Sequence, residues 1–188
     1  MLPTRPDLLR PGLDLVFVGI NPGEESARRG HYYAHSGNRF WRALSTSGLA
    51  PRDVTFEDDS WLSEACGIGF TDVVKRVVTD SSKVTGAEVI KAIPRFRERI
   101  AAASERIAAA SPRIICFTGG RQCDDVFPDL RAATGWGQQL PATLEGAEVW
   151  VMPFTSGLAA RWRDEGQRVP EALAMHLSRT RELTETAS

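Results

Sequence analysis

The sequence predicts a three-layer α/β/α fold, in which helices cover both faces of a central, mainly parallel sheet. Short apolar runs that read as buried strands, at 13–19, 113–119 and 140–153, alternate with segments of helical spacing. The first run is apolar on both faces, as a central strand of a parallel sheet is. The length of 188 residues suits one domain, with 1–12 as a lead-in and 185–188 as a tail.

The first half of the chain predicts one strand, two loops and a helix. The strand at 13–19 leads into a long loop that ends at Gly37. Asn38 is then a suitable N-cap for a helix that Gly48 closes. Further on, the glycine-rich stretch 67–76 predicts a second loop beside apolar residues.

The second half predicts a βα unit, a hairpin and a terminal helix. Thr85 starts a helix that Pro94 should break or restart. The strand at 113–119 is followed by a helix over 121–127, and 140–153 forms two strands around Glu145-Gly146. A loop over 153–163 precedes a final helix, roughly Pro170 to Thr184.

Composition narrows the function classes. The formal net charge of −1 gives no global field to attract a polyanion, so nucleic acid would need a local basic patch. Cys66, Cys116 and Cys123 form no CxxC pair and are expected to be buried free thiols in a reducing cytoplasm. No apolar run is long enough to span a bilayer, and the first residues lack the apolar core of a signal peptide.

Three loops, 19–38, 67–76 and 153–163, follow predicted strands or lie near strand ends, so a parallel sheet can bring them to one edge. In the first loop, Asn21 can orient a water or a ligand amide, or else cap its own turn. Tyr33 can stack on a flat ring or anchor the loop to the core. Asp72, in the second, is either a turn cap or a general base.

The third loop contains Ser156-Gly157-Leu158, in which the leucine packs in the core or enters a base stack as a wedge. Arginines near the first and third loops either form the local basic patch or are solvated separately; they are Arg28, Arg29, Arg39, Arg42, Arg161, Arg163 and Arg168. The three histidines show no metal-ligand spacing, so the sequence predicts neither a metal nor an organic cofactor.

Four motifs resemble the mismatch-specific uracil-DNA glycosylases and the thymine-DNA glycosylases. They are GINPG at 19–23, HYYAHSGNRFW at 31–41, GIGFTD at 67–72 and MPFTSGLA at 152–159. They occur in the order typical of that family, and the resemblance covers about residues 10–185. It implies a uracil-DNA glycosylase-like fold and a repair enzyme that flips a damaged base out of double-stranded DNA and hydrolyses its N-glycosidic bond.

The resemblance also implies a set of site residues. Asn21 matches the residue that positions the attacking water, and Tyr33 the aromatic that stacks on the flipped base. The base pocket would comprise Gly19, Ile20, Ser26 and Tyr33, with Ser26 near the 5-position of the base. The DNA-binding residues would be Asn38, Gly157, Leu158, Ala159 and Arg161, of which 157–159 fill the gap and face the orphaned guanine.

The chain departs from the family pattern at three places. Glu24 and Glu25 follow GINPG, where an apolar residue is common, and this places acid near a phosphate-binding face. Phe154-Thr155 stand where the bacterial branch has Asn-Pro, and Asp72 stands where that branch has lysine and the animal branch asparagine. A carboxylate at 72 adds a second candidate for water activation, beside Asn21. We therefore expect a monomeric, cytoplasmic glycosylase with Asn21 and Asp72 as catalytic residues. The alternatives are a non-catalytic lesion-binding module on the same fold and a nucleotide-binding α/β protein unrelated to DNA. The absence of a P-loop motif counts against the second alternative.

Overall fold

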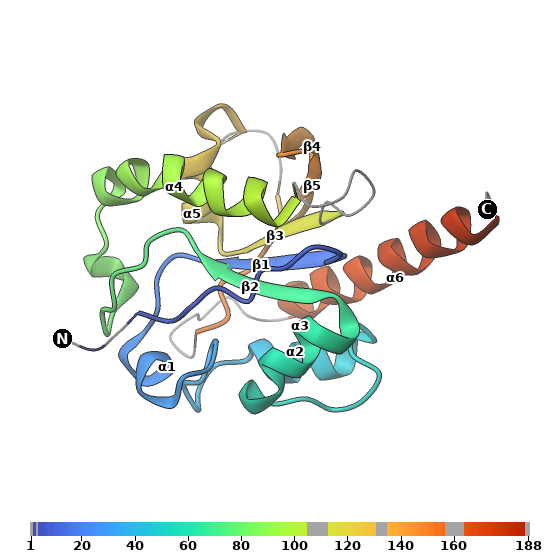
Figure 1. Ribbon diagram of the computed structural model, residues 1–188, viewed down its shortest axis with the longest axis horizontal. Helices are drawn as coiled ribbons and strands as arrows, with labels where there is room; N and C mark the ends of the chain where they lie inside the picture. The colour runs from blue at the N-terminus through green and yellow to red at the C-terminus, as the bar shows by residue number, and fades with distance from the viewer. Residues whose placement is uncertain (1, 3, 105–112, 131–134, 157–163, 187–188) are drawn as a thin grey trace.

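The computed structural model describes residues 2, 4–104, 113–130, 135–156 and 164–186. In these residues, five strands form one sheet in the order β2-β1-β3-β5-β4 (Figure 1). The strands are β1 (Leu15–Gly19), β2 (Ile68–Asp72), β3 (Ile114–Thr118), β4 (Gly137–Leu144) and β5 (Ala147–Met152). Neighbouring strands are parallel except for the antiparallel pair of β4 and β5. The prediction of a mainly parallel sheet is therefore confirmed.

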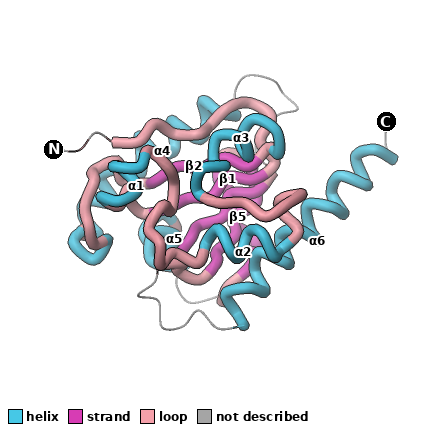
Figure 2. Tube along the Cα trace, turned by 90° about the horizontal axis from the view of Figure 1, so that it is seen from below, coloured by secondary structure: helices cyan, strands magenta, loops and turns pink. Residues whose placement is uncertain are grey.

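Helices cover both faces of this sheet, as the sequence predicts. One face packs against α4 (Gly86–Ser104) and α5 (Gly120–Val126), and the other against α2 (Phe40–Ser47), α3 (Asp59–Cys66) and α6 (Asp164–Thr186). Figure 2 shows α2 and α3 in front of the strands, and α6 extending beyond them. Along β1, Leu15 and Phe17 face the α2 layer while Val16 and Val18 face the α4 layer. Every residue of β1, β2 and β3 is buried, because both faces of the sheet are covered.

Short elements complete the chain. The long loop after β1 contains a helix, α1 (Glu24–Arg29), which the sequence did not predict. The 3-10 turns are η1 (Phe56–Asp58), η2 (Ser81–Lys83) and η3 (Pro128–Leu130). The predicted hairpin around Glu145-Gly146 is present, and both turn residues have positive φ. The last helix begins earlier than predicted, at Asp164, and contains Pro170.

The prediction of a loop over 67–76 is wrong, because its first part is the edge strand β2. The two glycines of GIGFTD lower the strand propensity of this stretch. Gly69 is needed there because the lead-in crosses the strand closely, where Leu8 pairs with Phe70. A Cβ at position 69 would lie 2.5 Å from Leu13 Cδ1 and 2.7 Å from the Leu8 carbonyl oxygen.

Two predictions about helix boundaries also need correction. Helix α4 runs through Pro94 without a break. An internal proline costs about 3 kcal/mol, but Val89, Phe96 and Ile100 on both sides of it are fully buried against the sheet, at roughly 1.5–3 kcal/mol each. Helix α2 begins at Phe40, so that Arg39 occupies the N-cap position. Asn38 still serves the helix start, since its Oδ1 accepts from the Phe40 N–H at 3.0 Å.

The three cysteines are free thiols, of which Cys116 and Cys123 are buried and Cys66 is partly buried. Burial raises the pKa of the Cys123 thiol to about 12, so it remains protonated at neutral pH. In the part of the chain that the structure describes, no helix combines the length and apolarity that crossing a bilayer requires.

Replacing Gly69 by alanine should lower the free energy of unfolding by roughly 1–3 kcal/mol, because the new methyl overlaps Leu13 and the lead-in backbone. Urea unfolding measures the change. Gly23→Ala is the matched control, since nothing lies within 4 Å of a Cβ there and its φ of −73° suits any residue. Equal stability of the two variants would contradict the close crossing.

Candidate active site

The carboxyl ends of β2, β1 and β3 place three residues in a row on the α2 face of the sheet. Asp72 and Gly19 are direct partners in the register of β1 and β2, and Thr118 ends β3 on the other side of β1. A Cβ on Gly19 would overlap Asp72 Oδ1 and would lie 3.5 Å from the Tyr33 hydroxyl. The absence of a side chain at 19 therefore creates the space in which the carboxylate and the phenol meet.

Asp72 is 3% exposed, an unusual position for a carboxylate. Burial raises its pKa to about 7, against the opposing influence of Lys75, Arg5 and Arg99, and the charge of Asp7 raises it further. Among the described residues, no hydrogen bond joins the carboxylate to loop backbone, which a turn cap would require. A carboxyl group that titrates near neutral pH is suited to general-base work.

Tyr33 holds the first loop over the carboxyl ends of these strands, which form the edge that carries the candidate site. Its hydroxyl lies 3.2 Å from Thr118 Oγ1, and the threonine donates to the Val18 carbonyl at 3.1 Å, so the tyrosine donates to the threonine. Its ring packs on Phe40 with 4.3 Å between centroids. Burial and the nearby Asp72 raise the pKa of the Tyr33 phenol well above its ordinary value, which keeps it protonated. Tyr33 is thus the loop anchor that the sequence allowed, and its role as a base-stacking ring stays a prediction.

Asn21 combines an anchored amide nitrogen with an unused oxygen. Its Nδ2 donates to the Pro22 carbonyl at 2.9 Å and to the Val78 carbonyl at 3.4 Å. Its Oδ1 is buried and has no hydrogen-bond partner in the described part of the chain. A buried acceptor of this kind calls for a water or a ligand donor, because leaving it unpaired costs about 1–3 kcal/mol.

Main-chain hydrogen bonds keep Asn21 and Asp72 on neighbouring segments. Val73 N–H donates to the Gly19 carbonyl at 3.0 Å, and Val74 N–H donates to the Ile20 carbonyl at 2.9 Å. These bonds continue the pairing of β1 and β2 past the ends of the strands. The structure thus brings the two predicted catalytic residues to one edge, next to Gly19 and Tyr33.

Other predicted site residues have structural partners of their own. Ile20 is 5% exposed and packs in the core on the α4 face, so its main chain alone borders the edge. Ser26, on α1, accepts from the Ala34 N–H at 3.1 Å and thereby fixes the loop ahead of Phe40. Asn38 is engaged at the start of α2. The base-binding and DNA-binding roles of these residues stay predictions.

The predicted gap-filling residues Gly157, Leu158 and Ala159, and the phosphate-binding Arg161, lie outside the described residues. Two members of the predicted basic patch, Arg28 and Arg29, form ion pairs with Glu24 and Glu25 on the same helix. Their charges are therefore largely balanced within α1. This favours the alternative in which these two arginines do not contribute to a shared basic patch.

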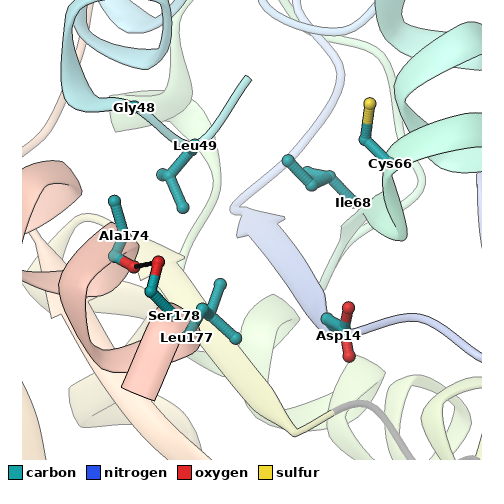
Figure 3. A pocket seen from close by; sticks show the side chains of 8 residues that line it. All are labelled: Asp14, Gly48, Leu49, Cys66, Ile68, Ala174, Leu177 and Ser178. Carbon is teal, nitrogen blue, oxygen red and sulfur yellow. Dashed lines mark hydrogen bonds between the residues drawn. The ribbon is translucent and has the colours of Figure 1, made fainter. Parts of the chain in front are cut away.

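A small cavity lies at the opposite end of the strands. Its volume is about 30 Å³, room for little more than a water molecule. Figure 3 shows Leu49, Ile68 and Leu177 converging on it, with Asp14 at the start of β1. Because Asp14 precedes β1 and Ile68 begins β2, this cavity is remote from Asn21 and Asp72. In α/β sheets ligands bind at the carboxyl ends of the strands, so we assign the cavity no role.

Sequence reasoning missed Thr118, which fixes the Tyr33 hydroxyl, and Asp59, which is fully buried. Asp59 accepts from Arg5 at 2.8 Å and from the Tyr32 N–H at 2.9 Å, so it ties the lead-in to the tyrosine loop. Thr118 was open to detection as a polar residue at the end of an apolar strand, whereas Asp59 lies in an acidic stretch that gives no such signal. Over the described ranges, no group of three or more His, Cys, Asp or Glu residues is placed to hold a metal ion.

The fold and the strand ends define an α/β/α protein with polar groups gathered at the carboxyl ends of its parallel strands. The sequence matches the uracil DNA glycosylase superfamily over residues 6–177, and the chain belongs to that superfamily. It is also similar to the solution NMR structure of a candidate uracil DNA glycosylase from Methanosarcina acetivorans, with a TM-score of 0.63 and 26% identity. That match covers 94% of this chain and 98% of the other, so the predicted uracil-DNA glycosylase-like fold is confirmed.

Replacing Asp72 by asparagine should raise the melting temperature at about pH 8 by at least about 3 °C. The folded-state pKa of about 7 lies above the ordinary value of 3.8, so the folded protein binds the extra proton between these pH values. Stability is then lost as pH rises from about 4 through about 7, at up to about 1.4 kcal/mol per pH unit. Asparagine does not ionise, so the gain should vanish at about pH 4. A variant less stable than the parent at both pH values would show that Asp72 caps its loop.

Proposed function

We propose that this protein is a monofunctional DNA N-glycosylase that excises uracil, chiefly from G·U mismatches in double-stranded DNA. One observation carries the proposal: a buried carboxyl group with a pKa of about 7 and a buried, unpaired amide oxygen lie at the same edge of a uracil-DNA glycosylase-like fold. We also propose that the enzyme belongs to the mismatch-specific and thymine-DNA glycosylase branch, on the four motifs, and that it acts as a cytoplasmic monomer.

Hydrolysis of an N-glycosidic bond needs a positioned water and stabilisation of a sugar that becomes oxocarbenium-like. Asn21 Oδ1 accepts a hydrogen bond from one hydrogen of the water, which stays on the oxygen, and so orients that oxygen toward C1′. Asp72 takes the other proton as the C1′–O bond forms and the C1′–N bond breaks. The base departs as an anion, is held by main-chain N–H groups and is protonated by solvent. The products are a free base and an abasic site.

The remaining roles concern DNA. The target nucleotide is flipped out of the duplex, a step that costs least at a mismatched base. The pocket is bordered by Gly19, the Ile20 main chain, Ser26 and Tyr33. Gly157, Leu158 and Ala159 occupy the gap left in the duplex, while Asn38 and Arg161 contact the strand. No metal or organic cofactor enters this mechanism.

The purified protein should release uracil from a G·U duplex without added metal, and EDTA should not affect the rate. Oligonucleotides with uracil opposite G, opposite A and unpaired, treated with alkali after incubation, reveal the abasic sites as strand breaks. Tight binding of all three substrates with no cleavage would favour the alternative, a lesion-binding module without activity.

Under single-turnover conditions, Asp72→Ala should slow cleavage by about 10²–10⁴-fold, the usual contribution of a general base. Asn21→Ala should slow it less, because the carboxylate shares the work of holding the water. The parent rate should rise with pH through about 7, since the base must be ionised. Ser45→Ala, on the far part of α2, serves as a variant outside the edge. A stable Asp72→Ala protein that cleaves at the parent rate would refute the general-base role.

A further inference from the structure

A group of charged side chains surrounds Asp7, in the lead-in beside the edge strand β2. The Asp7 carboxylate accepts from Lys75 Nζ at 2.8 Å and from Thr71 Oγ1 at 2.6 Å, and Arg99 Nε lies 2.8 Å from its other oxygen. These partners come from β2, from the segment that follows it and from α4. One carboxylate therefore engages two cations from separate parts of the fold. None of these residues is assigned a role in the mechanism above.

The Asp7 cluster, meaning Asp7, Thr71, Lys75 and Arg99, adjoins the catalytic edge. Thr71 is the neighbour of Asp72 in β2, and Lys75 follows three residues later. Arg99 links the cluster to Asp72 directly, because its Nη2 donates to the Asp72 carbonyl at 2.7 Å. The guanidinium thus contacts both the Asp7 carboxylate and the main chain of the proposed base.

The Asp7 cluster is shielded from solvent well enough for its charges to act at Asp72. The Asp7 side chain is 14% exposed, and those of Lys75 and Arg99 are 26% exposed. Charges in such partly buried positions are screened less than those on the surface. The electrostatic effect at Asp72 is therefore the sum of the two positive charges and the one negative charge.

The groups that face Asp72 can be accounted for element by element. Tyr32 and Tyr33, from the first loop, are protonated and uncharged at neutral pH. Arg5, from the lead-in, is paired with Asp59 at 2.8 Å. Lys75 and Arg99 are the other cations that lower the pKa of Asp72, and Asp7 is the anion that raises it. Asp7 is thus the anion that opposes the attraction of these two cations for the Asp72 carboxylate.

We propose that Asp7 is a positioning residue that keeps Lys75 and Arg99 paired to itself, so that Asp72 stays a proton acceptor and does not become an ion-pair partner. This inference rests on the proposed function only in giving Asp72 the role of base. A carboxylate held in an ion pair is a weaker base, because its charged form is already stabilised.

The proposal predicts two shifts of opposite sign in the pKa of Asp72. Without the Asp7 charge, the attraction of both cations is no longer opposed, and the pKa of Asp72 falls. Without the Lys75 charge, one attraction is removed and the pKa of Asp72 rises. Each single change should move it by roughly half a unit or more, as nearby partly buried charges do. Removing both together leaves the sum of charges unchanged and should return the pKa close to that of the parent.

The test uses Asp7→Asn, Lys75→Met and the double variant, all close in shape to the parent. Glu88→Gln is the matched control, because Glu88 is also a carboxylate paired to a nearby arginine, Arg76, which is not a member of the Asp7 cluster. The side-chain ¹³C resonance of Asp72, assigned with Asp72→Asn, is titrated by NMR in the free protein. The pH profile of single-turnover uracil release from a G·U duplex is recorded beside it.

We expect the titration of Asp72 to move down in Asp7→Asn, up in Lys75→Met, and back in the double variant, with no shift in Glu88→Gln. The acid limb of the rate profile should move in the same directions. Shifts in one common direction, or no shift, would overturn the inference. If Asp7→Asn does not fold, Lys75→Met must still raise the pKa, and a failure to do so has the same meaning. Because the NMR titration needs no catalysis, inactivity with the predicted shifts would reject the glycosylase proposal alone.

Discussion

The approach of the Asp72 carboxylate to Gly19 is the constraint on which the edge of this sheet depends. The two residues are register partners in adjacent parallel strands, so their side-chain positions lie on one face and cannot both be filled. Glycine at 19 gives the carboxylate and the Tyr33 hydroxyl their space. Tyr33 in turn reaches Thr118, so the contact spreads across three strands and fixes the first loop. A larger residue at 19 would displace the proposed base, the loop and the end of β1 together.

Burial gives Asp72 its chemistry and also makes it unfavourable for folding. The same loss of solvation that raises its pKa to about 7 disfavours the ionised form in the folded protein. The surrounding fold must therefore supply the stability that this position removes. It does so through two apolar layers, one on each face of fully buried strands, which hold β1 and β2 in register whatever the protonation of Asp72. Locally unfavourable features of this kind are typical of functional sites.

The sequence predicted those parts of the structure that depend on local pattern. Strands β1 and β3 are mainly apolar runs, β5 is apolar except for Glu148, and Gly48 ends α2 as expected, with a φ of 82°. Strand β2 was missed because Gly69 is required by a contact with a segment distant in sequence. The lead-in passes so close to Gly69 that a side chain there would overlap it. Pro94 was misjudged because packing of α4 on the sheet outweighs a local penalty. In the candidate site, Asn21 and Asp72 were predicted as polar residues in loops near strand ends, although Asp72 is the last residue of β2. Their surroundings, from Thr118 to Asp7, come from segments far apart in sequence and carry no local signal.

In the proposed mechanism, the two polar groups at the strand ends divide the requirements of hydrolysis between them. An amide such as that of Asn21 can orient a water at any pH, but it does not accept a proton, so alone it leaves the water weakly nucleophilic. A carboxylate accepts the proton, but only if it is ionised and not already neutralised by a cation. Burial of Asp72 alone would leave two nearby cations to pair with it. A second carboxylate, Asp7, engages both of them at 2.8 Å from the outer side of the edge strand. In the proposed mechanism the lead-in is therefore part of the catalytic apparatus, because the counter-charge that preserves the base lies there and not in any of the strand-end loops.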